Sequence, residues 1–221
     1  MSQFMPTNMT SCLAVQLLNV VLMTIALGGT ALAAGTPSVA TDARVYAKPK
    51  ALPEFALQDA DGRPFTNEQL AGKWSLILLG FTHCPDICPF TLQNLAHVRQ
   101  EMSTRVSPSR LPQIVFLAVD PERDRPVLAE YVRYFDEAIV GVSGEWSEIK
   151  QMVESLDGFV RITGKRPGAD DYTVHHSAVV SLVSPEGKLV AGINPPLRAG
   201  EASIFIAETM LQYSRKNAKT E

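Results

Sequence analysis

The sequence has no charged residue in its first 41 positions, few cysteines and no excess of basic side chains. Its 221 residues include 20 basic and 23 acidic side chains, for a formal net charge of −3. The missing basic excess argues against a nucleic-acid-binding domain. Three cysteines are too few for a disulfide-rich scaffold. The length is sufficient for one domain with its own hydrophobic core and a tail.

The uncharged N-terminal stretch predicts export across a membrane. Residues 12–34 are predominantly apolar and long enough for a transmembrane helix. A secretory signal peptide is the alternative, with Leu13–Leu27 as its apolar core and Ala31–Ala33 as a small-residue cleavage site. No basic residue precedes the apolar run, so the usual orientation signal is weak. Residues 1–34 are therefore expected to be a transmembrane anchor or a signal peptide.

The stretch that follows resembles a linker in its composition. Residues 35–52 are rich in Ala, Thr, Ser and Pro and show no apolar periodicity. A folded domain is expected over residues 53–215, and residues 216–221 are expected to form a short tail.

Buried strands alternate with amphipathic helices in the expected domain. Continuous apolar runs at Ser75–Phe81 and Ile114–Val119 predict strands that are buried on both faces. The other expected elements are a hairpin over Phe55–Phe65, helices over Pro89–Met102, Arg125–Phe135, Trp146–Leu156 and Gly200–Tyr213, a short strand over Ile139–Val142, and a late hairpin of Ser177–Ser184 and Lys188–Ile193. This order predicts a three-layer α/β domain with a mixed central sheet, for which a thioredoxin-like fold is the natural candidate.

Cys84 and Cys88 lie between the first buried strand and the helix that follows it. Four residues apart, they would share one face in helical geometry, and a helix N-terminus would favour thiolates. Asp120 follows the second buried strand, and this topology places it near the cysteines, although it could equally be an N-cap residue. The cysteine pair could bind a soft metal ion or form a disulfide. Two thiolates and one imidazole suit Cu(I), whereas structural zinc requires four ligands.

The histidines supply the candidates for a third ligand. The chain has four of them, at His83, His97, His175 and His176. His97 is expected on the exposed face of its helix, and His83 adjoins Cys84, so its side chain could point away. His175 and His176 are expected to open the late strand. Consecutive side chains of a strand point to opposite faces, so only one of these two can face the cysteines.

Three motifs together resemble the Sco/SenC family of copper-binding, thioredoxin-like assembly proteins. Phe81–Pro89, with its Cys-Pro-Asp-Ile-Cys-Pro core, resembles the family signature. Asp120–Asp124 is similar to the family's second motif, and Asp171–Ser177 is similar to the motif that supplies a histidine ligand. The resemblance covers about residues 53–215, which is nearly all of the expected domain.

The resemblance implies a copper site, with Cu(I) or Cu(II) bound by Cys84, Cys88 and His176. Alignment on Ser177 assigns the ligand role to His176, and His175 then stands where the family usually has an acidic residue. Such a protein would deliver copper to the CuA centre in subunit II of cytochrome c oxidase, or to another copper enzyme. It would bind and transfer its cargo and would not be an enzyme in the strict sense.

A second hypothesis follows from the same resemblance, because some bacterial relatives resemble thiol–disulfide reductases that keep the CuA cysteines reduced. Cys84 and Cys88 would then be a redox pair. Family members are usually tethered to the bacterial or mitochondrial inner membrane. The N-terminal stretch lacks arginine, which argues against a mitochondrial presequence. The expected location is therefore the bacterial inner membrane with the domain in the periplasm, or the periplasm itself if residues 1–34 are cleaved.

Overall fold

A computed structural model describes residues 42–166 and 171–218 of the chain. The anchor or signal peptide expected over residues 1–34 lies outside the described residues, as do residues 35–41 of the expected linker. None of the helices in the described ranges combines the length and the apolar character that a bilayer crossing requires.

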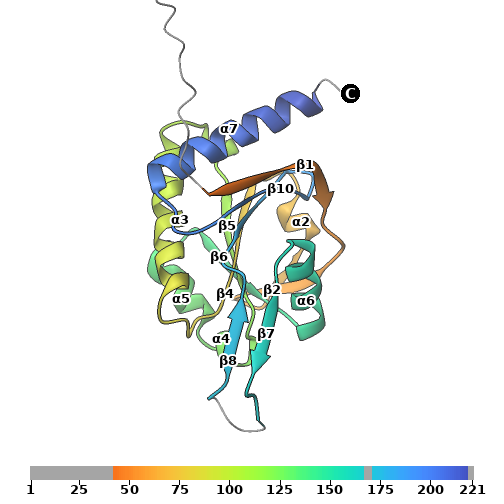
Figure 1. Ribbon diagram of the computed structural model, residues 1–221, viewed down its shortest axis with the longest axis vertical. Coiled ribbons are helices and arrows are strands. Elements are labelled where there is room, and N and C mark those ends of the chain that lie inside the picture. Colours follow the sequence, from red (N-terminus) through yellow and green to blue (C-terminus); the bar gives the residue numbers. More distant parts are fainter. Residues whose placement is uncertain (1–41, 167–170, 219–221) are drawn as a thin grey trace, which may run out of the picture. The chain divides into compact units, whose positions relative to one another are not determined.

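An eight-stranded mixed sheet forms the centre of the domain, in the order β1–β10–β9–β4–β5–β6–β2–β3 (Figure 1). Its strands are β1 (Ala43–Ala51), β2 (Ala56–Asp59), β3 (Pro64–Thr66), β4 (Ser75–Gly80), β5 (Gln113–Ala118), β6 (Ile139–Ser143), β9 (Val180–Val183) and β10 (Lys188–Ile193). Strands β4, β5 and β6 are parallel neighbours, and the other pairings are antiparallel. The mixed central sheet of the prediction is confirmed.

Helices cover both faces of this sheet, as Figure 1 shows with α3 and α5 on one side and α6 on the other. The helices are α2 (Asn67–Leu70), α3 (Ile87–Ser103), α4 (Pro121–Asp124), α5 (Leu128–Phe135), α6 (Trp146–Ser155) and α7 (Ala199–Asn217), with a 3-10 turn over Pro108–Arg110. The late hairpin over β9 and β10 is present as predicted. Helix α7 continues to Asn217, past the predicted start of the tail at residue 216.

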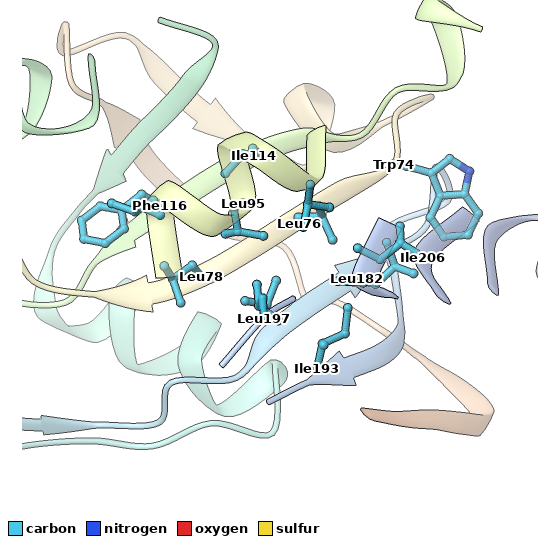
Figure 2. Packing of buried hydrophobic residues seen from close by; sticks show 14 of the residues in the cluster. Trp74, Leu76, Leu78, Leu95, Ile114, Phe116, Leu182, Ile193, Leu197 and Ile206 are labelled. Atoms are coloured by element: carbon cyan, nitrogen blue, oxygen red, sulfur yellow. The ribbon is translucent and has the colours of Figure 1, made fainter. Parts of the chain in front are cut away.

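The side chains of β4 divide the core into two halves. Leu76 and Leu78 belong to a cluster with the apolar faces of α3, α5 and α7 (Figure 2). Ile77 and Leu79 belong to the cluster on the opposite face, together with residues of α6. All six residues of β4 are buried, as expected for a strand covered on both sides. A continuous apolar run thus supplies two hydrophobic layers at once.

The linker predicted over residues 35–52 is wrong for its described part, because Ala43–Ala51 forms the edge strand β1. The strand pairs with β10 in antiparallel register, for example Ala43 with Ile193. None of its side chains is buried, so the alternating apolar pattern of a strand is absent. Backbone hydrogen bonds with β10 hold β1 in the sheet, and a search for apolar periodicity does not detect such a strand.

Two other segments also differ from the prediction. The helix expected over Arg125–Phe135 begins only at Leu128, after the one-turn helix α4 and a break that contains Pro126. His175 and His176 do not open a strand of the sheet. They end β8 (Thr173–His176), which pairs with β7 (Val160–Thr163) as a separate two-stranded ribbon.

Replacing Gly80 with alanine should destabilise the domain. A Cβ at this position would lie 2.5 Å from Cε2 of Phe116 and 3.3 Å from Sγ of Cys88. Phe116 is completely buried, so its ring has no room to move. Overpacking of this kind costs about 1–3 kcal/mol of unfolding free energy. Gly200→Ala is the control, since a Cβ there meets nothing within 4 Å. Urea unfolding that gives equal stabilities for Gly80→Ala and Gly200→Ala would contradict this account.

Candidate metal centre

The cysteine turn connects the carboxyl end of β4 with the start of α3. Helix α3 begins at Ile87, so Cys88 lies in its first turn, whereas Cys84 precedes the helix and donates its backbone N–H to the Phe81 carbonyl at 3.2 Å. The prediction that helical geometry places both cysteines on one face is therefore wrong. The turn itself brings them together, since the side chain of Cys84 interacts with the Cys88 thiol. Both are free thiols, with Cys88 buried and Cys84 half-buried.

The Cys88 thiol holds its proton strongly. Burial raises the pKa of this thiol far above its ordinary value, a backbone hydrogen bond from Phe81 lowers it in part, and Cys84 and Asp124 raise it further. The thiolate expected at the helix N-terminus is thus not favoured at Cys88, because the side chain is only 2% exposed. A metal ion bound here would have to displace this proton, since a thiol coordinates metal as thiolate.

His176 is the histidine that faces the buried cysteine. Its Nε2 lies 3.5 Å from Sγ of Cys88, and its Nδ1 lies 2.9 Å from the Ser177 carbonyl oxygen. A carbonyl oxygen can only accept a hydrogen bond, so Nδ1 carries the ring proton and Nε2 keeps a free lone pair. The Phe81 ring meets the imidazole edge-on, with 5.9 Å between ring centroids. This arrangement leaves Nε2 available to bind a metal ion.

The other three histidines lie away from this pair. His175 is on the opposite face of β8, exposed, with Nε2 3.3 Å from Oγ1 of Thr163. His83 is exposed, with Nδ1 3.0 Å from Oγ1 of Thr82. His97 is exposed on α3, as the sequence predicts. The expected opposite orientation of His175 and His176 is therefore confirmed, although their strand is the ribbon strand β8.

Cys84, Cys88 and His176 form a donor set that suits a soft metal ion. Among the described residues, no three His, Cys, Asp or Glu side chains are already close enough together to hold a metal. Metal binding would therefore require a side-chain movement that completes the set. Two sulfur donors and one imidazole nitrogen nevertheless match the ligand chemistry of copper.

Two completely buried carboxyl groups lie beside the cysteine turn, at Asp120 and Asp124. Asp120 does not contact the turn directly: it accepts hydrogen bonds from the Tyr172 hydroxyl at 2.8 Å and from Nε of Arg123 at 2.5 Å. Asp124 does reach the turn, since its Oδ1 accepts from the backbone N–H of Thr82 at 2.8 Å and from the Thr82 hydroxyl at 2.7 Å. Its Oδ2 accepts from the backbone N–H of Asp120 at 3.0 Å.

Asp124 is the functional residue that the sequence does not single out. Burial raises the pKa of its carboxyl, and the hydrogen bonds from Thr82 and Asp120 lower it in part. The motif over residues 120–124 contains three acidic residues, Asp120, Glu122 and Asp124, and the sequence does not show which of them faces the cysteines. A hint lies in the spacing alone, because Asp124 follows Asp120 by one helical turn and can therefore lie on the same side of the helix.

Comparisons with known proteins agree with this geometry. The SCO1/SenC family model matches residues 44–210. The human protein "Protein SCO1 homolog, mitochondrial" is 32% identical over 166 residues, which are 74% of this chain and 54% of the human protein. The chain spans about half the length of the curated mitochondrial relatives it matches.

Two solved structures of similar proteins contain copper. The structure of Arabidopsis thaliana ScoI with copper bound is 33% identical, with a TM-score of 0.66, and the match covers 73% of this chain and 98% of that one. The structure of Bradyrhizobium japonicum ScoI with copper bound is 30% identical, with a TM-score of 0.62, and the match covers 72% of this chain and 99% of that one. The thioredoxin-like fold predicted for the domain is therefore the Sco fold.

The metal-free protein should lose stability in acid through His176. Burial lowers the pKa of this imidazole below its ordinary value of 6.5, so protonation favours the unfolded chain. The stabilisation is fully present above pH 6.5 and is lost as the pH falls through the folded-state pKa. The unfolding free energy of wild type should fall more steeply than that of His176→Gln between about pH 7.5 and pH 5.

Urea unfolding at several pH values measures this difference. The control is His97→Gln, which removes an exposed imidazole and should keep the wild-type pH dependence. Parallel pH profiles for wild type and His176→Gln would show that His176 is not a buried neutral imidazole.

Proposed function

Since this chain belongs to the SCO1/SenC family, we propose that it binds copper through Cys84, Cys88 and His176 and passes the ion to a protein recipient. The observation that carries the ligand assignment is the approach of an unprotonated ring nitrogen, Nε2 of His176, to the buried Cys88 sulfur at 3.5 Å. These residues are 88 positions apart in the chain, so no local structure accounts for their meeting.

Copper is the metal that fits this donor set best. Thiolate ligands select soft ions such as Cu(I), and imidazole suits copper as well. A structural zinc site would require a fourth protein ligand. The copper-bound structures of two ScoI proteins that are at least 30% identical to this chain support the same choice. The proposed cargo is thus Cu(I) or Cu(II), with Cys88 and His176 as the inner ligands.

Transfer would begin at Cys84. This cysteine is half-buried and precedes the helix, whereas Cys88 is buried. A three-coordinate ion leaves one side open, so a thiolate of the recipient can bind before any ligand leaves. The bond to Cys84 then breaks, and the released thiolate takes up a proton from water. Repeating the exchange at Cys88 and His176 frees the ion from the chain.

The surroundings of Cys84 support a protein as recipient. A hollow of about 380 Å³ next to the turn is lined by Thr82, His83, Val127 and Tyr134, among others. Two of these lining residues are strongly exposed, Tyr134 at 84% and Val127 at 40%. Large exposed apolar side chains that gather at one place are typical of contact surfaces between proteins.

The recipient that we propose is the CuA domain of cytochrome c oxidase subunit II, as the resemblance of the three motifs implies. Residues 1–34 would hold the domain at the bacterial inner membrane, facing the periplasm, or direct it there as a cleaved signal. Reduction of the CuA cysteines by the Cys84–Cys88 pair is the competing function. The buried, protonated Cys88 and the histidine beside it favour metal binding over thiol exchange.

A copper titration tests the proposed ligand set. The reduced full-length chain, in mild detergent and without oxygen, should bind one Cu(I) in competition with a chelator. Loss of a surrounding residue at a metal site costs about 10–100-fold in affinity, and His176→Ala, which removes a ligand, should cost at least as much. Cys84→Ser and Cys88→Ser should likewise weaken binding.

His175→Ala is the matched control, because it removes the neighbouring imidazole from the opposite face of the same strand. It should leave the copper affinity unchanged. Equal losses from His175→Ala and His176→Ala, or no binding by wild type, would overturn the ligand set. The reduction potential of the Cys84–Cys88 pair would then become the decisive quantity, and the reductase hypothesis would be preferred.

A further inference from the structure

The proposed histidine ligand is carried by a structure outside the central sheet. The β7–β8 ribbon pairs only with itself among the described strands, and His176 is its last residue. Figure 1 shows the ribbon next to α4, below the strands of the central sheet. The distance between His176 and the cysteines therefore depends on what fastens the ribbon to the rest of the domain.

A buried cluster at the start of β8 supplies this attachment. The Tyr172 hydroxyl donates to Oδ1 of Asp120 at 2.8 Å, and Nε of Arg123 donates to Oδ2 of the same carboxylate at 2.5 Å. The Arg123 guanidinium lies over the Tyr172 ring, 3.8 Å from its centroid. Its Nη1 also donates to the Tyr172 carbonyl oxygen at 3.4 Å. Arg123 thus holds both the side chain and the backbone of the ribbon residue.

The chemistry of this cluster requires arginine. A planar guanidinium can donate to a carboxylate along its edge and stack on an aromatic ring with its face. Asp120 is completely buried, and its charge needs both the hydrogen bonds and the cation. Lysine would offer a point charge without the flat surface, so it would replace only part of these contacts.

The cluster is connected with His176 in two ways. Tyr172, Val174 and His176 alternate along the chain, so they point to the same face of the ribbon. Tyr172 and Val174 are buried in the core cluster of that face. The Arg123 guanidinium also lies 5.7 Å from the centroid of the Phe81 ring, which packs edge-on against the His176 imidazole.

We propose that Arg123 is a positioning residue for the copper site: with Asp120 and Tyr172 it fastens the ribbon to α4 and so sets where His176 stands relative to Cys88. Its contacts described above are with Asp120, Tyr172 and Phe81, so Arg123 would act on copper affinity through the position of His176. This inference rests on the proposed function, because the effect on copper requires His176 to be a ligand.

A double-mutant cycle in the full-length reduced chain tests the inference. Arg123→Met and Tyr172→Phe should each weaken Cu(I) binding by about 10–100-fold, as changes around a metal ligand do. In the His176→Ala background the same substitutions should change the affinity by less than about twofold. A factor of about two is the tolerance within which such free-energy differences are regarded as zero in a double-mutant cycle. Nitrogen hyperfine coupling in the Cu(II) spectrum of Arg123→Met should weaken, and Arg123→Lys should restore it only in part.

Lys165→Met is the matched control. Its ammonium also lies near the Tyr172 ring, at 5.2 Å, but it is an exposed partner of Glu122 and does not reach Asp120. This variant should keep the wild-type copper affinity. Equal losses for Arg123→Met with and without His176 would show general damage to the fold and would overturn the inference, as would a wild-type affinity in both Arg123→Met and Tyr172→Phe.

Hydrogen exchange of the metal-free protein gives a readout that does not depend on copper. Amides of residues 160–163 and 173–176 should exchange faster in Arg123→Met, while those of β4 should not. Tyr172→Phe provides the same comparison if Arg123→Met does not fold. Unchanged hydrogen exchange in the ribbon of Arg123→Met would overturn the inference, whatever the result for copper. A wild-type chain that does not bind copper would reject the proposed function.

Discussion

A carboxylate in a protein interior must be fully hydrogen-bonded, and two of them organise this site. Asp120 and Asp124 are completely buried at the two ends of the one-turn helix α4, and the backbone N–H of Asp120 donates to Oδ2 of Asp124. Asp124 holds the cysteine turn through Thr82, and Asp120 holds the histidine ribbon through Tyr172 and Arg123. The cost of burying these charges without partners is several kcal/mol each, so both halves of the site are tied to one short helix.

The parallel pairing of β4 and β5 brings the cysteine turn and α4 to the same side of the sheet. Strands β4 and β5 run parallel in register, with Gly80 opposite Ala118, so the cysteine turn and α4 leave the sheet at the same edge. The backbone N–H of Val119 donates to the Gly80 carbonyl at 2.9 Å and continues the pairing to the last residues of both strands. Gly80 also leaves the space into which the Phe116 ring and the Cys88 sulfur pack. The candidate site thus lies at the carboxyl end of the parallel strands, and the two buried carboxylates fix the positions of the cysteine turn and of the histidine ribbon there.

How much of the structure follows from the sequence depends on whether an element carries its own pattern. Strand β4 and helix α3 could be predicted, because their burial is recorded in a continuous apolar run and in a helical repeat that includes Leu92 and Leu95. Strand β1 could not, because its side chains are not buried and its partner β10 lies about 140 residues further along the chain. What β1 lacks is the alternation of buried apolar side chains by which a half-buried strand is recognised in a sequence.

The site shows the same division. The cysteine pair and the choice of His176 came from motif spacing and from alignment on Ser177, and the structure brings His176 to Cys88. The roles of Asp120 and Asp124 could not be separated, because which carboxyl faces the cysteines depends on the rotation of a one-turn helix against the sheet. The geometry of the cysteine pair was also misjudged, since spacing by four implies a shared face only if the helix includes both residues. Here α3 begins at Ile87, after Cys84.

Cys84 precedes helix α3 and Cys88 lies in its first turn, so the two cysteines have different surroundings and would have different roles in metal binding. Cys88 is buried and His176 is half-buried, and burial raises the pKa of the thiol and lowers that of the imidazole, so both side chains favour their uncharged forms. Copper would bring positive charge into this environment and take the thiol proton's place, which couples loading to proton release. Cys84 stands outside the helix and half in solvent, where exchange with a partner thiolate costs little desolvation. The proposed site would thus keep the metal through Cys88 and His176 and release it first from Cys84.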